Sequence, residues 1–100
     1  LKQMEKKYTA FTDTLFKAVL TLKSVEECYD FFEDICTVKE IQTLSQRLEV
    51  AKLLQQNKSY TEISKETGAS TATVSRVKQC FTYGTGGYKA VLQRLEEGGK

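Results

Sequence analysis

The sequence predicts an all-α fold. Proline is absent and glycine occurs only six times in 100 residues, so few residues interrupt a helix. Apolar residues recur at spacings of three and four, and no segment alternates polar and apolar residues as a half-buried strand does. At this length we expect a single domain over residues 1–100.

Helix caps and apolar periodicity divide the first half of the chain into three predicted helices. The first carries one long apolar stripe, formed by Met4, Tyr8, Phe11, Leu15, Ala18 and Leu22. The pairs Ser24 with Glu27 and Thr37 with Glu40 have the spacing of capping boxes, and they begin the second and third helices. Asn57 is a residue type that tolerates the left-handed conformation, and it ends the third helix.

Three shorter helices are predicted in the second half. Ser59 and Glu62 form another capping box, and Gly68 ends the helix that follows. Ser70 begins the next helix, which runs to the glycine-rich break at residues 84–87. The sixth helix carries the apolar residues Val91, Leu92 and Leu95.

The first three helices carry more apolar and aromatic surface than a 100-residue bundle easily buries. We therefore expect a two-fold homodimer, with dimerisation helices over about residues 3–57. A helix-turn-helix is expected over about residues 60–82 and a C-terminal helix over about residues 88–97. The alternative is a monomeric bundle wrapped by its long first helix.

Composition excludes most enzyme classes. Histidine is absent, which removes the commonest general base and the commonest metal ligand. No cofactor or metal is expected. Three cysteines without a CxxC spacing favour neither a disulfide framework nor a zinc site, so we expect Cys28, Cys36 and Cys80 to be buried apolar residues in a reducing cytoplasm.

No apolar run approaches the roughly 20 residues that span a bilayer, and no signal peptide opens the sequence. We therefore expect a cytoplasmic protein without a membrane partner. The chain begins at Leu1 instead of methionine, so we expect further residues before Leu1.

Charge is distributed unevenly along the chain, although the net charge is only +2. Residues 1–23 hold five lysines against two acidic residues, and residues 58–89 hold five basic residues against two acidic ones. Between them, residues 24–40 hold six acidic residues against one lysine. This pattern suits a molecule that presents one basic face to phosphate groups.

The segment from Tyr60 to Phe81 has the pattern of a helix-turn-helix. Ile63 is placed to pack under the second helix, and Ser64 is small where the two helices cross. Gly68 supplies the positive φ of the turn. Val74 and Val77 are placed to bury the inner face of the second helix. Thr67 departs from the pattern, because a larger apolar residue usually occupies this position.

A DNA interface is predicted on the outer side of the second helix, with double-stranded DNA as the partner. The candidate contacts on this helix, including its first turn, are Ser70, Thr71, Ala72, Thr73, Ser75, Arg76, Lys78 and Gln79. Lys58 and Lys65 join Lys78 as candidates to neutralise flanking phosphates. The alternative is an ordinary helical corner in a protein–protein adaptor without a DNA-binding role.

These residues resemble the Trp repressor superfamily, and more closely its Trp-repressor-like YerC/YecD family of bacteria. The resemblance extends from about Leu15 to Leu95. It depends on residues 37–40, 44–47, 53–54 and 62–76. The resemblance implies an intertwined six-helix homodimer that acts as a sequence-specific transcriptional regulator, and we expect a repressor.

The resemblance also implies an effector pocket between the third and fifth helices, where family repressors hold tryptophan as corepressor. The matching positions are Arg47, Thr73, Arg76, Val77 and Cys80. The family has glycine where Val77 stands and serine where Cys80 stands. Because the Val77 isopropyl group would occupy the space of the indole, we expect that tryptophan is not the corepressor, and the effector stays unknown.

Overall fold

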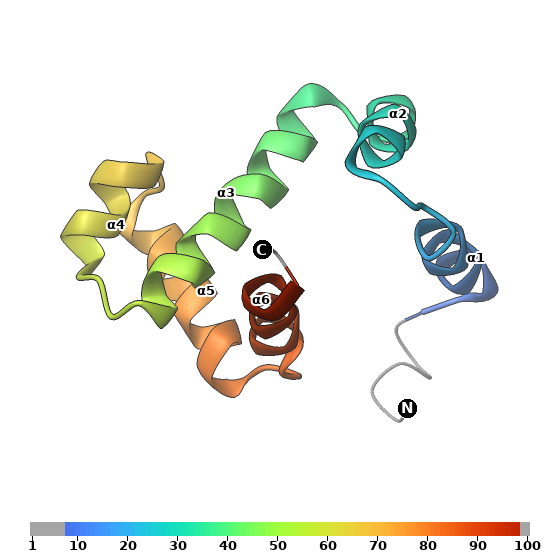
Figure 1. The fold of residues 1–100 in the computed structure, drawn as a ribbon. Coiled ribbons are helices and arrows are strands. Elements are labelled where there is room, and N and C mark those ends of the chain that lie inside the picture. Colours follow the sequence, from blue (N-terminus) through green and yellow to red (C-terminus); the bar gives the residue numbers. More distant parts are fainter. Residues whose placement is uncertain (1–7, 99–100) are drawn as a thin grey trace. The chain divides into compact units, whose positions relative to one another are not determined.

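In the computed structural model, residues 8–98 are described, and they form six helices without a strand (Figure 1). The helices are α1 (Ala10–Val19), α2 (Val25–Ile35), α3 (Val38–Gln55), α4 (Tyr60–Thr67), α5 (Thr71–Tyr83) and α6 (Gly87–Gly98). This confirms the predicted all-α, six-helix fold. The chain divides into two compact units, one ending at Val38 and one beginning at Lys39. The single domain expected from chain length stays a prediction.

Helix α1 is shorter than its predicted apolar stripe. It begins after Thr9, whose hydroxyl accepts hydrogen bonds from the backbone N–H groups of Phe11 and Thr12. Tyr8 therefore precedes the helix, and Met4 lies outside the described residues. At the other end, the Thr21 hydroxyl donates to the Ala18 carbonyl at 2.6 Å. This bond occupies a carbonyl of the last turn, so Leu22 lies beyond the helix.

Helix α2 begins at Ser24, as predicted, with the Ser24 hydroxyl accepting from the Glu27 N–H at 3.1 Å. In a complete capping box the Glu27 carboxylate would accept from the Ser24 N–H. Here it accepts from the N–H of the preceding residue, Lys23, at 3.0 Å. No residue of α1 or α2 is buried. The expectation of three buried cysteines is wrong, because Cys28 on exposed α2 and Cys80 are both exposed and Cys36 is half-buried.

The hydrophobic core lies in the C-terminal unit. Its buried residues come from all four helices and from the turn before α5: Val50, Ala51, Leu53, Ile63, Ala69, Val74, Val77 and Leu92. Leu54, Phe81 and Tyr88 pack against this cluster. Burying one side chain the size of valine or leucine contributes about 1.5–3 kcal/mol, so this cluster supplies most of the unit's apolar stabilisation.

Asn57 ends α3 in the left-handed conformation that was predicted for it, with φ of 63°. Helix α3 begins directly after Thr37, and the capping box of Thr37 and Glu40 stays a prediction. Among residues 8–98, no helix combines the length and the apolarity that crossing a membrane requires. In the same part of the chain, no three or more His, Cys, Asp or Glu side chains gather as a metal site would need.

Candidate nucleic-acid interface

The turn between α4 and α5 has helix-turn-helix geometry. Gly68 ends α4 with φ of 78°, and its N–H donates to the Ser64 carbonyl at 2.8 Å. Ser70 begins α5, and its hydroxyl accepts from the Thr73 N–H at 3.1 Å. Because only glycine adopts this φ without strain, the sequence specifies the sharp turn locally. The predicted roles of Gly68 and Ser70 as caps are confirmed.

Thr67 occupies the position where a larger apolar residue was expected, and hydrogen bonds explain how it fits. Its hydroxyl donates to the Ile63 carbonyl at 2.7 Å and accepts from the Ala69 N–H at 3.1 Å. The Thr67 carbonyl accepts from the Gln46 side-chain amide at 3.1 Å, which ties the end of α4 to α3. These three hydrogen bonds therefore hold the turn at Thr67. They take the place of the apolar packing that a larger side chain would provide at this position.

The inner side of the motif is packed as predicted. Ile63 and Val74 have no exposed surface, and Val77 is 3% exposed. The Ser64 hydroxyl oxygen on α4 is shielded from solvent and has no hydrogen-bond partner. The two helices are therefore held by apolar contact, and the Ser64 hydroxyl adds nothing to that contact.

The outer side of α5 is exposed along its length. The exposed candidates are Thr71, Ala72, Ser75, Arg76, Lys78 and Gln79, together with Ser70 at the cap. Thr73 differs, because it is half-buried and its hydroxyl accepts from the Ser70 hydroxyl at 3.1 Å. Thr73 is therefore less accessible than its neighbours on α5, and its contact with DNA stays a prediction.

Two exposed aromatic residues of the motif were not predicted. Tyr83 is 77% exposed in the last turn of α5, and Tyr60 is 37% exposed in the first turn of α4. Tyr83 follows Ala72, Arg76 and Gln79 at helical spacing, which places these four residues on one side of α5. That spacing is a signal that was present in the sequence.

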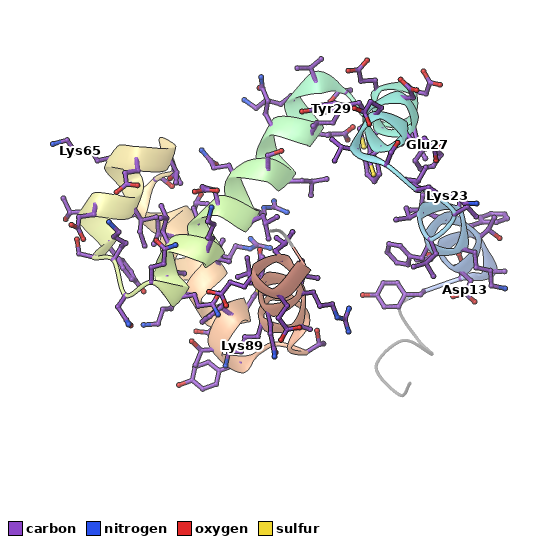
Figure 2. The ribbon with its side chains drawn as sticks, viewed as in Figure 1. Asp13, Lys23, Glu27, Tyr29, Lys65 and Lys89 are labelled. Carbon is purple, nitrogen blue, oxygen red and sulfur yellow. The ribbon has the colours of Figure 1, made fainter. Side chains whose placement is uncertain are left out.

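The three candidate lysines differ in their surroundings. The Lys58 ammonium lies 3.9 Å from the Glu66 carboxylate, so this lysine already has an anionic neighbour. Lys65 and Lys78 are exposed, and Figure 2 shows Lys65 extending outward from α4. Lys65 and Lys78 are therefore better placed than Lys58 to meet a phosphate.

The cap of α4 also carries charge. The Ser59 N–H and hydroxyl both bond with Glu62, at 2.9 Å to its carboxylate and 3.1 Å from its N–H. These hydrogen bonds lower the pKa of Glu62, and the nearby Lys58 ammonium lowers it further. The predicted capping box is confirmed. The carboxylate lies at the positive end of the helix dipole, which is where a negative charge is favoured.

The positions of the expected effector pocket do not share one environment. Val77 belongs to the buried core, whereas Arg47, Arg76 and Cys80 are exposed and Thr73 is half-buried. Cys80 lines a hollow of about 570 Å³ together with Leu48, Tyr88 and Val91. The structure therefore places Val77 in the core, whereas the two arginines lie at the surface.

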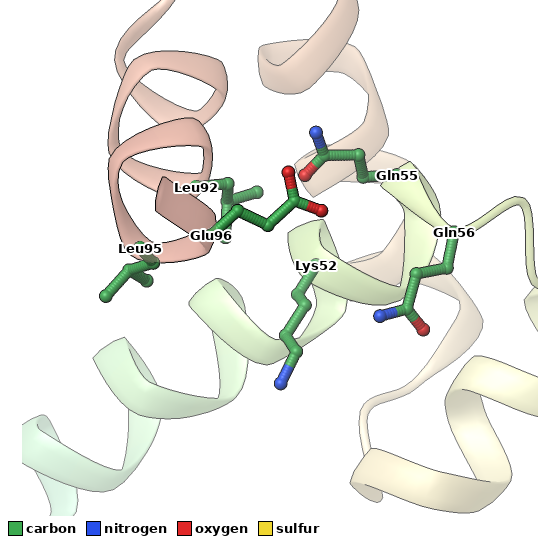
Figure 3. A pocket seen from close by; sticks show the side chains of 6 residues that line it. All are labelled: Lys52, Gln55, Gln56, Leu92, Leu95 and Glu96. Atoms are coloured by element: carbon green, nitrogen blue, oxygen red, sulfur yellow. The ribbon is translucent and has the colours of Figure 1, made fainter. Parts of the chain in front are cut away.

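A second hollow, of about 410 Å³, lies between α3 and α6 (Figure 3). Lys52, Gln55 and Gln56 line it from α3, and Leu92, Leu95 and Glu96 line it from α6. Figure 3 shows the Lys52 side chain extending away from the Glu96 carboxylate. The one cationic group of this hollow therefore does not meet its carboxylate, as the charged groups of a converging ligand site would.

Comparisons with known proteins agree with this geometry. Residues 10–96 match the family model for the Trp repressor protein. The chain is 55% identical over 85 residues to the uncharacterized protein YerC of Bacillus subtilis (strain 168), a match that covers 85% of this chain and 82% of YerC.

Two solved structures are also similar. A TrpR like protein from Eubacterium eligens ATCC 27750 superposes with a TM-score of 0.88 at 48% identity, covering 96% of each chain. A candidate Trp repressor from Staphylococcus aureus superposes with a TM-score of 0.89 at 53% identity, covering 94% of each chain. These matches extend over both units of the chain.

Proposed function

Because this chain belongs to the Trp repressor protein family, which is non-enzymatic, we propose that it is a sequence-specific DNA-binding transcriptional regulator. It acts as a homodimer, and each subunit inserts the first turn of α5 into the major groove. The observation that carries this proposal is the turn at Gly68, which places an exposed, small-residue helix face after a rigid corner.

Side-chain size supports a close approach to DNA. Thr71, Ala72 and Ser75 are exposed in the first two turns of α5 and are all small. Small hydroxyls and a methyl group let the helix backbone come near base edges, where the hydroxyls can bond and the methyl can contact thymine. The first N–H groups of α5 suit a phosphate oxygen, because the positive end of the helix dipole lies there.

Charge supports the same face. Lys65, Arg76 and Lys78 are exposed on α4 and α5, so a dimer brings roughly six cationic groups to the DNA. Each phosphate contact changes the slope of log affinity against log salt by about −0.9. We therefore expect a slope of about −5 for the dimer.

Exposed apolar surface on α1 and α2 supports the homodimer. Phe11, Phe16 and Tyr29 are 86%, 54% and 59% exposed. At about 200 Å² for each aromatic side chain, they leave roughly 400 Å² uncovered. One partner in a standard interface buries about 800 Å², so these three residues supply half of that area. Two helices without a buried residue need such a partner to stay folded.

The burial of Val77 supports a regulator that does not use tryptophan. Its isopropyl group packs in the core with Val74 and Ile63, at the position where the resemblance implies glycine and an indole ring. The two exposed arginines, Arg47 and Arg76, are then free for phosphate or packing contacts.

The experiment is a selection of bound duplexes from a random pool, followed by fluorescence-anisotropy titration of the selected duplex at two salt concentrations, with and without tryptophan. We expect selective, salt-sensitive binding that ignores tryptophan. Arg76→Ala should weaken binding and reduce the salt slope by about 2 for the dimer. Arg94→Ala removes the same side chain from an exposed position on α6 and is the matched control. Absence of any selected duplex would favour a protein–protein adaptor.

A further inference from the structure

The short connection from α5 to α6 has a backbone conformation that depends on two glycines. The Gly84 N–H donates to the Cys80 carbonyl at 2.8 Å and ends α5. A side chain at Gly84 would overlap that carbonyl oxygen, and Gly86 has φ of 92°. Both positions require glycine, so the direction in which α6 leaves α5 is determined by the backbone.

The first turn of α6 contacts the last turns of α5 through two consecutive residues. The Tyr88 side chain is half-buried and packs against the core cluster. The Lys89 ammonium lies 5.3 Å from the centroid of the Phe81 ring on α5, a cation–π distance. These contacts tie the end of the helix that carries the DNA-contact residues to α6.

Tyr88 also reaches the third helix. It lines one hollow together with Leu48 of α3, Cys80 of α5 and Val91 of α6, so side chains of three helices meet around it. Burial raises the pKa of the Tyr88 phenol, the Cys80 thiol raises it further, and the Arg47 guanidinium of α3 acts in the opposite direction.

We propose that Tyr88 is a positioning residue for DNA binding: its ring, supplied by the chain itself, holds α5 at a set distance from α3 without a diffusible effector. This inference rests on the proposed DNA-binding function. Val77 belongs to the buried core, and Tyr88 packs against that core and lines the hollow beside Cys80. Between them they hold α5 in its place, so the turn at Gly68 is presented to DNA in one orientation.

The test measures the affinity of Tyr88→Ala for the selected duplex, at a temperature at which circular dichroism shows the variant to be folded. We expect a loss of at least about tenfold, comparable to losing one base contact. Adding p-cresol, which matches the deleted side chain, should restore affinity by filling the space. Tyr88→Phe should keep wild-type affinity. Leu95→Ala, which removes an exposed apolar side chain from the same helix, is the control for losing apolar volume outside the junction.

Each outcome decides the inference. Wild-type affinity in Tyr88→Ala would overturn it, and so would p-cresol that raises the melting temperature of this variant without restoring affinity for DNA. If Tyr88→Ala does not fold, Tyr88→Leu takes its place, because leucine is apolar but too short to replace the ring at the junction, and wild-type affinity in that variant would overturn the inference. A wild-type protein that selects no duplex removes the proposed function and this inference together. A wild-type protein that binds, with a Tyr88→Ala that binds equally, removes this inference alone.

Discussion

Replacing Val77 by glycine tests whether the core has taken over the space of a ligand. Val77 is 3% exposed and belongs to the buried cluster of the C-terminal unit. Deleting its side chain forfeits about 2 kcal/mol of burial. Glycine in the interior of a helix adds about 1 kcal/mol relative to alanine. We therefore expect Val77→Gly to lower the free energy of unfolding by about 3 kcal/mol, and by more where the cavity stays open.

Urea unfolding at one fixed protein concentration measures this loss, since dimerisation makes stability depend on concentration. Val91→Gly is the matched control, because Val91 is 44% exposed on α6. Val91→Gly removes about half as much buried surface, which costs about 1 kcal/mol. With about 1 kcal/mol more for glycine inside a helix, we expect the free energy of unfolding to fall by about 2 kcal/mol. Equal losses at the two positions would refute the packing role of Val77.

Calorimetric titration with tryptophan completes the test. We expect no saturable heat from the wild-type chain, and measurable binding in Val77→Gly, where the deleted isopropyl group leaves room in the core. Saturable binding to the wild-type chain in the micromolar range would refute the reasoning, because the indole would then fit despite the valine. If neither protein gives a saturable heat of binding, then residues besides Val77 also exclude tryptophan.

Three further perturbations address single contacts. Ser64→Ala should leave the free energy of unfolding unchanged or raise it by about 1 kcal/mol in chemical denaturation, because the buried hydroxyl has no hydrogen-bond partner to lose. Gly84→Ala should lower the melting temperature, since the new methyl group overlaps the Cys80 carbonyl, whereas Gly98→Ala, which meets open space, should not. The pKa of Glu62 is lowered by its bonds to Ser59, so its contribution to stability is present above the ordinary glutamate pKa and is lost as pH falls through the lowered folded value. Glu62→Gln should remove that acid-dependent loss from an unfolding series against pH, and an unchanged series would contradict it.

Local signals account for what could be predicted at the turns. Ser59, Gly68 and Ser70 act through atoms within a few residues of themselves, so their residue types alone indicate where α4 ends and α5 begins. The inward spacing of Ile63, Val74 and Val77 is equally local, because helix periodicity determines which side of α4 and α5 they occupy.

Contacts between distant segments could not be predicted in the same way. Gln46 reaches the Thr67 carbonyl across 21 positions, and this bond helps a threonine stand where an apolar residue was expected. Lys58 is paired with Glu66, so it is less available to a phosphate than an unpaired lysine would be. Periodicity continued the first helix through Tyr8, but a hydroxyl at Thr9 competes for the backbone and begins α1 later.

By itself, the sequence determined six helices, a glycine turn and an exposed small-residue face, because caps, φ preferences and apolar periodicity are properties of neighbouring residues. Only the tertiary structure decided which side chains meet: that Val77 joins the core cluster, that Gln46 bonds to the Thr67 carbonyl, and that Tyr88 lies where α3, α5 and α6 come together. Those outcomes depend on how helices pack, and packing brings together residues whose separation in the sequence carries no signal.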